Sequence, residues 1–350
     1  MTGGASVIKK LLNTLYVLSE DSYLRLDGEN IVIQRGGETS ARFPLHTLEG
    51  IHCYSYPGAT PQLMGACAEH GIALHFYTPR GRYLASAVGE NQGNVLLRRT
   101  QHQVSDNAIA SCRIARHMII GKVYNSRSVL ERALRDHPQR VDQKKQKEAS
   151  TALALLLPQI EQEVDLDSLR GLEGTAANLY FGVMDELILQ SREIFYFNSR
   201  SRRPPLDPFN ALLSFAYTLL ARDCAAALTG VGLDPYVGFL HRLKPGRSSL
   251  ALDLMEELRP LRADRFILTL INNRVIQAKH FHIKENETCL LDEEGRKVFL
   301  TAWQERKQET IMHPFLKENV SWGLLPHVQA LLLARTLRGD YDAYPPFLWK

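Results

Sequence analysis

Residues 89–94 read Gly-Glu-Asn-Gln-Gly-Asn and separate two parts of the chain with different hydrophobic periodicity. The stretch is polar and contains two glycines, which is typical of a connection between folded units. Before it, apolar residues gather in short runs as in strands, and after it they recur every three to four positions as in helices. We therefore take residues 91–97 as a linker between an N-terminal domain (7–90) and a C-terminal domain (98–350).

The N-terminal part predicts a small β-rich domain. Short runs rich in β-branched, aromatic and leucine residues are separated by turn-forming sequences such as Asp-Gly-Glu-Asn at 27–30. A short helix is expected from Pro61, with Gly71 as its stop. We expect an antiparallel sheet or sandwich with this one helix. The expected strands are 15–18, 23–26, 31–34, 42–45, 51–54, 72–77 and 83–87.

The rest of the chain predicts a larger all-α domain, so that the fold class is α+β with two domains. The third of its helices is expected to stop at Pro158, because proline removes an intrahelical hydrogen bond. The expected helices are 108–125, 128–135, 144–157, 172–190, 208–228, 249–258, 266–272, 300–310 and 326–337.

Composition excludes several classes of protein. Of 350 residues, 45% are hydrophobic and 23% charged, as in folded soluble proteins. No run of 18 apolar residues occurs, so we expect no membrane span. Five widely spaced cysteines without a CxxC pair argue against a disulfide framework, and we expect a reduced, cytoplasmic protein. The net charge of +4 does not by itself establish a polyanionic partner.

Acidic residues in two separate stretches are candidates for a metal site. Glu173 stands beside two glycines, where a bulky partner can approach the backbone; a solvated glutamate in a first helical turn is the alternative. Asp253 and Glu256 lie three apart on one helix face, and Glu257 follows. Close carboxylates repel unless a cation lies between them. His241 lies upstream, and the fold would have to bring it in.

Such a ligand set is rich in oxygen and has one imidazole, which favours Mg²⁺ or Mn²⁺ over structural zinc. The alternative is that these acids pair with neighbouring arginines and lysines as ordinary surface charges. For His241 the alternative is a hydrogen-bonded structural histidine.

Two basic clusters accompany the acids and point to a phosphate-bearing partner. Arg200, Arg202 and Arg203 lie on a loop rich in serine and proline, and Lys244 and Arg247 lie beside the acid pair. The planar guanidinium donates two parallel hydrogen bonds to phosphate. A solvated basic loop is the alternative, but the position of both clusters beside the acids favours nucleic acid.

Asp207 is expected to cap the helix from Pro208, with the proline in its first turn. This helix is apolar except for a stripe of Asn210, Ser214 and Tyr217. Buried polar groups need hydrogen-bond partners, so the stripe faces either a polar cavity or a small internal network. The sequence motifs of several other enzyme classes are absent. There is no GxxxxGK[ST] phosphate loop, no GxGxxG after a strand, no HExxH and no GxSxG.

Taken together, these motifs resemble the CRISPR-associated protein 1 family. The resemblance is carried by Gly-Leu-Glu-Gly at 171–174, by Arg-Arg-Pro-Pro-Leu-Asp-Pro-Phe-Asn-Ala-Leu-Leu-Ser-Phe at 202–215, by His241 and by Leu-Asp-Leu-Met-Glu-Glu at 252–257. The opening Leu-Leu-Asn-Thr-Leu-Tyr-Val and the tail Arg-Gly-Asp-Tyr…Tyr-Pro-Pro-Phe look most like the branch that accompanies type I-C effector systems.

The resemblance implies a metal-dependent DNA endonuclease and integrase of CRISPR adaptation, an antiviral defence. It would insert foreign DNA spacers into a repeat array by attack of a 3′-hydroxyl on a phosphodiester. It would work as a homodimer, with the N-terminal domain assigned to dimerisation, and a dimer of the second CRISPR-associated protein would bridge pairs of dimers. A general metal-dependent nuclease of branched or single-stranded DNA, and a non-catalytic DNA-binding scaffold, are the alternatives.

Residue by residue, the resemblance implies catalytic roles for Glu173, His241, Asp253 and Glu256. Of these, Glu173, His241 and Glu256 would hold Mg²⁺ or Mn²⁺. Many relatives have aspartate at the last position, so the direct ligand among Asp253, Glu256 and Glu257 stays open. The residues expected to contact or orient DNA are Arg200, Arg202, Arg203, Lys244, Arg247, Tyr180, Asn210 and Tyr217.

Overall fold

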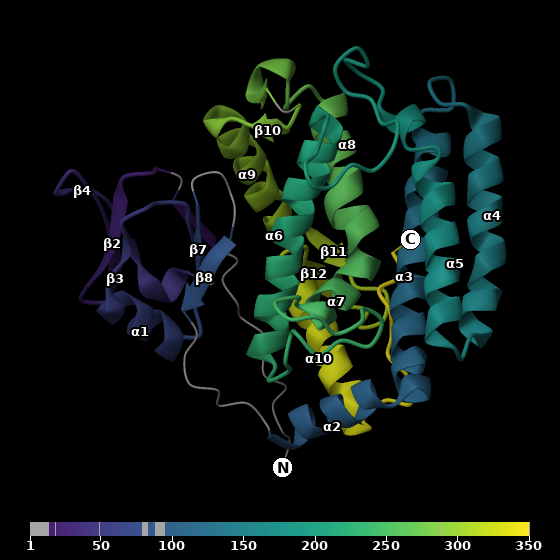
Figure 1. Cartoon of the computed structure of the whole chain (residues 1–350), viewed down its shortest axis with the longest axis horizontal. Coiled ribbons are helices and arrows are strands. Elements are labelled where there is room, and N and C mark those ends of the chain that lie inside the picture. The colour runs from purple at the N-terminus through teal and green to yellow at the C-terminus, as the bar shows by residue number, and fades with distance from the viewer. Residues whose placement is uncertain are drawn as a thin grey trace. The chain divides into compact units, whose positions relative to one another are not determined.

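The computed structural model describes residues 14–17, 19–48, 50–78, 83–87, 95–285 and 287–349. The predicted boundary at residues 89–94 lies outside the described residues. Two compact units are present, Met1–Gln92 with Leu300–Glu309 and Gly93–Phe299 with Thr310–Lys350 (Figure 1). The first unit is rich in strands and the second in helices, so the predicted α+β class is confirmed in outline.

One sheet of the first unit is antiparallel over most of its width, as expected. Its order is β4-β3-β2-β6, in which β2, β3 and β4 form a meander and only the two-residue β6 runs parallel to β2. Gly28 lies in the first turn with a positive φ of 58°, which suits glycine. The strands are β2 (Ser22–Asp27), β3 (Asn30–Arg35), β4 (Glu38–Pro44) and β6 (Gly58–Ala59).

The second sheet corrects the expectation of an antiparallel arrangement. In the order β1-β5-β7-β8, the first three strands run parallel and only β8 is antiparallel to its neighbour. Parallel neighbours need a crossover connection, which α1 supplies between β5 and β7. Short apolar runs carry no signal for strand direction. The elements are β1 (Thr14–Val17), β5 (Gly50–Cys53), α1 (Pro61–Glu69), β7 (Ala73–Tyr77) and β8 (Tyr83–Ala87).

In the second unit α3 packs against α4, α5 and α7, while α6 packs against α7 and α10 (Figure 1). This arrangement brings three helices that carry charged residues, α3, α5 and α7, together. The helices of this unit are α2 (Val95–Asp106), α3 (Ala108–Asp136), α4 (Gln143–Gln162), α5 (Leu166–Phe181), α6 (Pro208–Gly230), α7 (Ser249–Arg259), α8 (Arg265–Asn272) and α10 (Leu325–Arg338). Helix α9 (Glu293–Gln308) belongs to the second unit up to Phe299 and to the first from Leu300.

The C-terminal part is mainly helical but not all-α, which corrects that expectation. Two antiparallel pairs of three-residue strands interrupt the helices. Strands this short contain too few residues to show an alternating pattern. The pairs are β9 (Phe281–Ile283) with β10 (Cys289–Leu291) and β11 (Thr310–Met312) with β12 (Asn319–Ser321).

Several predicted helix limits are wrong. The segments 108–125 and 128–135 form one helix, α3, because no breaker lies between them, and α4 continues through Pro158 to Gln162. The unpredicted α2 begins at Val95, inside the range expected for the linker. Helix α5 begins at Leu166 and ends at Phe181, rather than spanning 172–190.

Helix α6 is a core helix. Its length and composition alone would suffice to cross a membrane, but half of the apolar window is buried inside the protein. As predicted, Asp207 caps it by accepting a hydrogen bond from the backbone N–H of Asn210 (2.7 Å), and Pro208 occupies the first turn.

Candidate active site

Two of the predicted acids converge on one lysine. The ammonium of Lys122, on α3, lies 2.6 Å from Glu256 Oε2 on α7 and donates a hydrogen bond to Glu173 Oε1 on α5. The side chains of Lys122 and Glu256 are buried, whereas that of Glu173 is 27% exposed. Three helices that are distant in sequence thus build one charged cluster that opens to solvent beside Glu173.

Arg259 adds a second cation to this cluster. Its guanidinium lies 2.9 Å from the other oxygen of Glu256, one turn back along α7. Burial alone would raise the pKa of Glu256, but the positive charges of Arg259 and Lys122, with a contribution from His241, hold that pKa below its ordinary value. Glu256 is therefore a carboxylate at neutral pH even though it is buried.

Asp253 holds the loop that carries His241. Its buried carboxylate accepts the backbone N–H groups of Phe239 (2.6 Å), Leu240 (2.9 Å) and His241 (3.0 Å). Its Oδ1 also lies 2.6 Å from His241 Nδ1. Because this bond engages Nδ1, the ring presents Nε2 for other contacts.

Gly238 allows the loop to approach the Asp253 carboxylate this closely. A Cβ on Gly238 would lie 2.7 Å from Asp253 Oδ2 and 2.8 Å from the backbone of Ser249. A larger residue at this position would push the loop off the Asp253 carboxylate. The fold therefore brings His241 and Asp253 together, as the sequence required.

Glu257 faces a different part of the protein. It is fully buried and accepts hydrogen bonds from Gln329 Nε2 (3.0 Å), the Phe347 backbone N–H (2.7 Å) and the Tyr344 hydroxyl. Burial raises the pKa of Glu257 to about 7 against the effect of these donors. Of the three acids on α7, Glu256 is the one that shares a cation with Glu173, while Glu257 binds the C-terminal tail.

The polar stripe on α6 forms an internal network with the basic loop. Asn210 Oδ1 accepts from Arg200 Nη1 (2.7 Å), and Ser214 Oγ accepts from Arg200 Nη2 (3.1 Å). The Arg200 guanidinium lies 5.5 Å from the centre of the Tyr217 ring. The structure thus favours the internal-network interpretation for Asn210 and gives Arg200 a role inside the fold.

The other predicted DNA contacts lie on loops or beside a small cavity. Arg202, Arg203 and Lys244 are exposed, and the Arg247 N–H donates to the Lys244 carbonyl (3.1 Å) in a turn. Tyr180 is buried, and its side chain lies away from solvent.

Asp264 connects this region to the acidic cluster. The Tyr217 hydroxyl donates to Asp264 Oδ1 at 2.6 Å, and the Arg259 guanidinium lies 4.6 Å from the centre of the Tyr217 ring. A cavity of about 10 Å³ is lined by Tyr180, Lys122, Arg259 and Asp264, among others. Burial raises the pKa of Asp264 to about 6.

Sequence reasoning missed Lys122 and Asp264. A signal existed for Lys122, which falls on the apolar stripe of a long helix, four residues after the buried Met118. Arg259 is one of the neighbouring cations that the sequence offers as a partner for the acids, and it pairs with Glu256. Asp264 has no comparable signal, because it lies in a π-helical turn (Pro260–Asp264) that begins with a proline.

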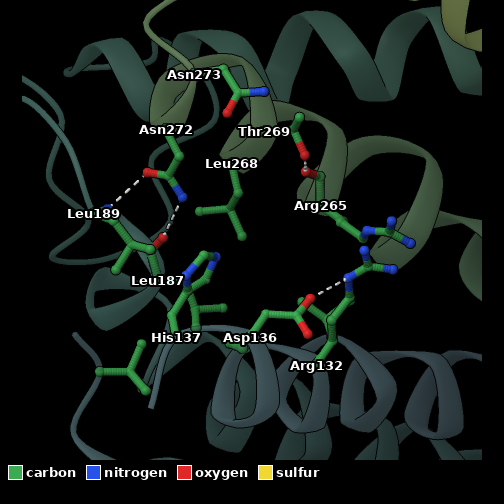
Figure 2. Close-up of a pocket in the computed structure, with 13 residues that line it drawn as sticks. Arg132, Asp136, His137, Leu187, Leu189, Arg265, Leu268, Thr269, Asn272 and Asn273 are labelled. Carbon is green, nitrogen blue, oxygen red and sulfur yellow. Dashed lines mark hydrogen bonds and ion pairs between the residues drawn. The ribbon is translucent and has the colours of Figure 1, made fainter. Parts of the chain in front are cut away.

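A larger cavity, of about 150 Å³, lies elsewhere in the helical unit between α3 and α8. Figure 2 shows Asp136 and Arg132 on one side and Asn272 on the other. The Asn272 amide donates to the Leu187 carbonyl (3.0 Å) and accepts from the Leu189 N–H (2.8 Å). None of the predicted site residues lines this cavity.

Within the described residues, no group of three or more His, Cys, Asp or Glu side chains is arranged to hold a metal ion. Glu173 and Glu256 nevertheless converge on one cation, and His241 lies near enough for its charge to lower the pKa of Glu256. The donor set, two carboxylates and an imidazole, fits Mg²⁺ or Mn²⁺.

The fold and this cluster define a mixed α+β protein with a largely buried group of paired acidic and basic side chains in its helical unit. The family model described as CRISPR associated protein Cas1 matches residues 15–305, and the chain belongs to this family.

Relatives that match nearly the whole chain support the same grouping. The chain is 47% identical to CRISPR-associated endonuclease Cas1 1 of Chlorobaculum tepidum over 343 residues, which cover 98% of this chain and 100% of that protein. It is 50% identical to CRISPR-associated endonuclease Cas1 2 of Rhodospirillum rubrum over 347 residues, with the same shares.

The fold resembles that of a CAS1 protein from Thermotoga maritima with a TM-score of 0.80, at 24% identity over 95% of this chain and 99% of that one. It also resembles a casposase bound to integration product with a TM-score of 0.81, at 21% identity over 96% and 94% of the two chains.

Proposed function

We propose that this protein is a metal-dependent DNA endonuclease and integrase that inserts spacers into a CRISPR array. The observation that carries the proposal is that Glu173 of α5 and Glu256 of α7 both contact the Lys122 ammonium. His241, which pairs with Asp253, completes the candidate ligand set. Relatives that match nearly the whole chain are named CRISPR-associated endonucleases, which supports a nuclease. Assignment to the type I-C branch is part of the proposal and rests on the opening and the tail.

In this proposal Glu173, Glu256 and His241 hold Mg²⁺ or Mn²⁺. The bound ion would polarise a phosphoryl oxygen and stabilise the oxygens that attack and leave. Asp253 fixes the tautomer and orientation of His241, so it acts on the reaction through the histidine. Arg259 keeps Glu256 ionised in a buried position.

The basic side chains hold the DNA backbone in this account. Arg202, Arg203 and Lys244 are exposed and free to pair with phosphates, and Arg247 lies one turn away from Lys244. The hydrogen bond between Arg200 and Asn210 keeps the basic loop in place. Tyr180 lines the small cavity together with Asp264, and Tyr217 donates a hydrogen bond to Asp264. Positioning and charge are the main contributions that the protein makes to phosphoryl transfer.

The proposed partners are DNA, a second copy of this chain through the N-terminal domain, and a dimer of the second CRISPR-associated protein. One structure with a similar fold is titled as a Cas6-RT-Cas1–Cas2 complex, and another as a casposase bound to integration product. Both titles are consistent with the proposed assembly and reaction. The domain limits 7–90, 91–97 and 98–350 remain part of the proposal.

A strand-transfer assay tests the function. Full-length protein is incubated with short duplex DNA, a repeat-bearing plasmid and Mn²⁺, with and without the second CRISPR-associated protein. We expect joined products from the wild type, and loss of joining in Glu173→Gln and His241→Ala. His137→Ala, a histidine on the rim of the larger cavity, is the matched control and should join normally.

The alternatives give other outcomes. Cleavage without joining, even with the partner present, would favour a general nuclease. DNA binding without metal-dependent chemistry in any variant would favour a scaffold whose acids form only ion pairs.

A further inference from the structure

Lys122 is a buried cation at the point where the proposed metal ion would be held. Its ammonium lies 2.6 Å from Glu256 Oε2 and bonds Glu173 Oε1 as well. Mg²⁺ holds carboxylate oxygens at about 2.0–2.1 Å. The same two oxygens, Glu173 Oε1 and Glu256 Oε2, therefore cannot hold the ammonium and the metal ion at the same time. A metal ion that binds there must displace the Lys122 ammonium.

Charge balance leads to the same conclusion. Glu173 and Glu256 are neutralised by Lys122 and Arg259, so these four charges sum to zero, and Asp264 adds a negative charge beside them. A divalent cation added while Lys122 still bridges the two glutamates would place three cations on two largely buried carboxylates, which is costly. Metal binding becomes favourable when Lys122 leaves the carboxylates.

The structure also contains a place for the displaced ammonium. The cavity of about 10 Å³ beside Lys122 has room for about one water-sized group, and an ammonium is of that size. Asp264 lines the same cavity, and its Oδ1 accepts the Tyr217 hydroxyl. Its other oxygen, Oδ2, is buried and makes no hydrogen bond of ordinary geometry within the described part of the chain, and its neighbour in the cavity is the Tyr180 hydroxyl, which interacts with this carboxyl and has no other partner there. Buried carboxylate oxygens normally have a donor.

We propose that Lys122 is a two-position counter-ion for the metal site. Its ammonium bridges Glu173 and Glu256 in the metal-free protein, and moves to Asp264 when a divalent ion takes the two carboxylates. Lys122 thereby keeps the acids in place for the metal ion and competes with it. This inference rests on the metal-dependent function proposed above.

Mn²⁺ binding to the full-length protein without DNA tests the proposal. The affinity is measured by titration calorimetry and by the electron paramagnetic resonance signal of free Mn²⁺. If Lys122 occupies the carboxylates in most molecules, Lys122→Met should bind Mn²⁺ about tenfold more tightly than the wild type. Lys307→Met, which removes another buried lysine, is the matched control and should bind like the wild type.

Asp264→Asn should weaken Mn²⁺ binding by about threefold, because the displaced ammonium loses its second carboxylate. Combined with Lys122→Met, the same change should have no effect, because no ammonium is left to move. An effect of Asp264→Asn that is equal in both backgrounds would overturn the movement to Asp264.

Lys122→Arg covers the case in which Lys122→Met does not fold. It keeps the positive charge, but a guanidinium is too large for the cavity, so this variant should bind Mn²⁺ more weakly than the wild type. Unchanged or weaker binding by Lys122→Met, or wild-type binding by Lys122→Arg, would overturn the proposal.

Failure of the proposed function itself has a different signature. Glu256→Gln should abolish Mn²⁺ binding. If Glu256→Gln binds Mn²⁺ like the wild type, the metal does not occupy this site, and both the metal assignment and the role of Lys122 are wrong. If Glu256→Gln abolishes binding but Lys122→Met does not strengthen it, the metal site stands and only the inference about Lys122 fails.

Discussion

At the scale of single residues, Asp253 shows how one buried carboxylate can orient a neighbouring loop and its histidine. Its two oxygens accept three backbone N–H groups and contact His241 Nδ1. No oxygen of Asp253 is turned toward Lys122, whereas Glu256, three positions later, pairs with it. On this geometry Asp253 is a positioning residue, and Glu256 is the better candidate for a direct ligand.

Asp253→Asn should lower stability and strand transfer together. The new amide would turn an N–H toward backbone N–H groups, which costs about 2–3 kcal/mol of unfolding free energy. Thermal unfolding checks the loss. Asp292→Asn is the matched control, because Asp292 accepts one backbone N–H, from Gly295 (2.6 Å), and lies outside the cluster.

The control should lose little stability, because the asparagine Oδ1 can still accept the Gly295 N–H, and it should keep full strand transfer. If Asp253→Asn loses no more stability than Asp292→Asn, then Asp253 does not hold the His241 loop as described.

The sequence offers Glu173, His241, Asp253 and Glu256 as candidates from their motifs, but it does not show how these side chains pair. The choice between Glu256 and Glu257 depends on which way α7 faces. Periodicity places residues on a helix face without saying what packs there. Lys122 was missed for the same reason, since its partners come from α5 and α7, far along the chain.

At the scale of elements, the loop before α6 combines one internal arginine with two exposed ones. Arg200 is held by Asn210 and Ser214, whereas Arg202 and Arg203 extend into solvent. Three arginines that look alike in sequence therefore differ in what their replacement should do.

Replacing Arg202 and Arg203 together with alanine should weaken DNA binding to a similar degree for all sequences. Each lost phosphate contact lowers the slope of log K against log salt by about 0.9 for duplex DNA, so the slope should flatten by about 2. Fluorescence anisotropy across a salt series measures it. Arg200→Ala is the contrast, and should lower the thermal midpoint through its lost internal bonds. An unchanged slope in the double variant would remove this loop from the DNA path.

The C-terminal tail is a second element fixed by buried polar groups. Asn125 Nδ2 donates to the carbonyls of Glu257 and Phe347, both at 2.7 Å, and Asn125 Oδ1 accepts the Trp349 N–H at 3.0 Å. Together with the bonds to the Glu257 carboxylate, these contacts fix the tail on α3 and α7. Stability should therefore depend on the ionisation of Glu257.

The pKa of Glu257 is raised from 4.5 to about 7 in the folded protein, so the folded state binds this proton more tightly than the unfolded state. The stabilisation is full below pH 4.5 and is lost as pH rises through 7. At about 1.36 kcal/mol per pKa unit, the loss is of the order of 3 kcal/mol.

Thermal midpoints measured from pH 5 to pH 8 check this effect. The midpoint of the wild type should fall with rising pH relative to that of Glu257→Gln, which cannot ionise at this position. Parallel profiles for the two proteins would show that Glu257 does not titrate in this range.

At the scale of the whole molecule, the sequence predicted a β-rich part followed by a helical part, and most elements within each. Helix α6 was clearest, since Asp207, Pro208 and its long apolar pattern agree. The direction of the strands was not predictable from short apolar runs. Whether β1, β5 and β7 pair in parallel depends on the crossover connections between them, which the runs themselves do not encode. The predicted helix ends are wrong where tertiary packing overrides local signals, as at Pro158, through which α4 continues.

In the proposed reaction, this protein joins DNA by attack of a 3′-hydroxyl at the Glu173–Glu256–His241 site. The most direct measurement compares short duplexes that end in a 3′-hydroxyl with duplexes that end in a 3′-dideoxynucleotide. Each is incubated with the wild type, Mn²⁺, the second CRISPR-associated protein and a repeat-bearing plasmid. The account predicts joined product from the hydroxyl-ended DNA, none from the dideoxy-ended DNA, and none from either with Glu256→Gln. Equal joining of both DNA ends, or full joining by Glu256→Gln, would contradict it.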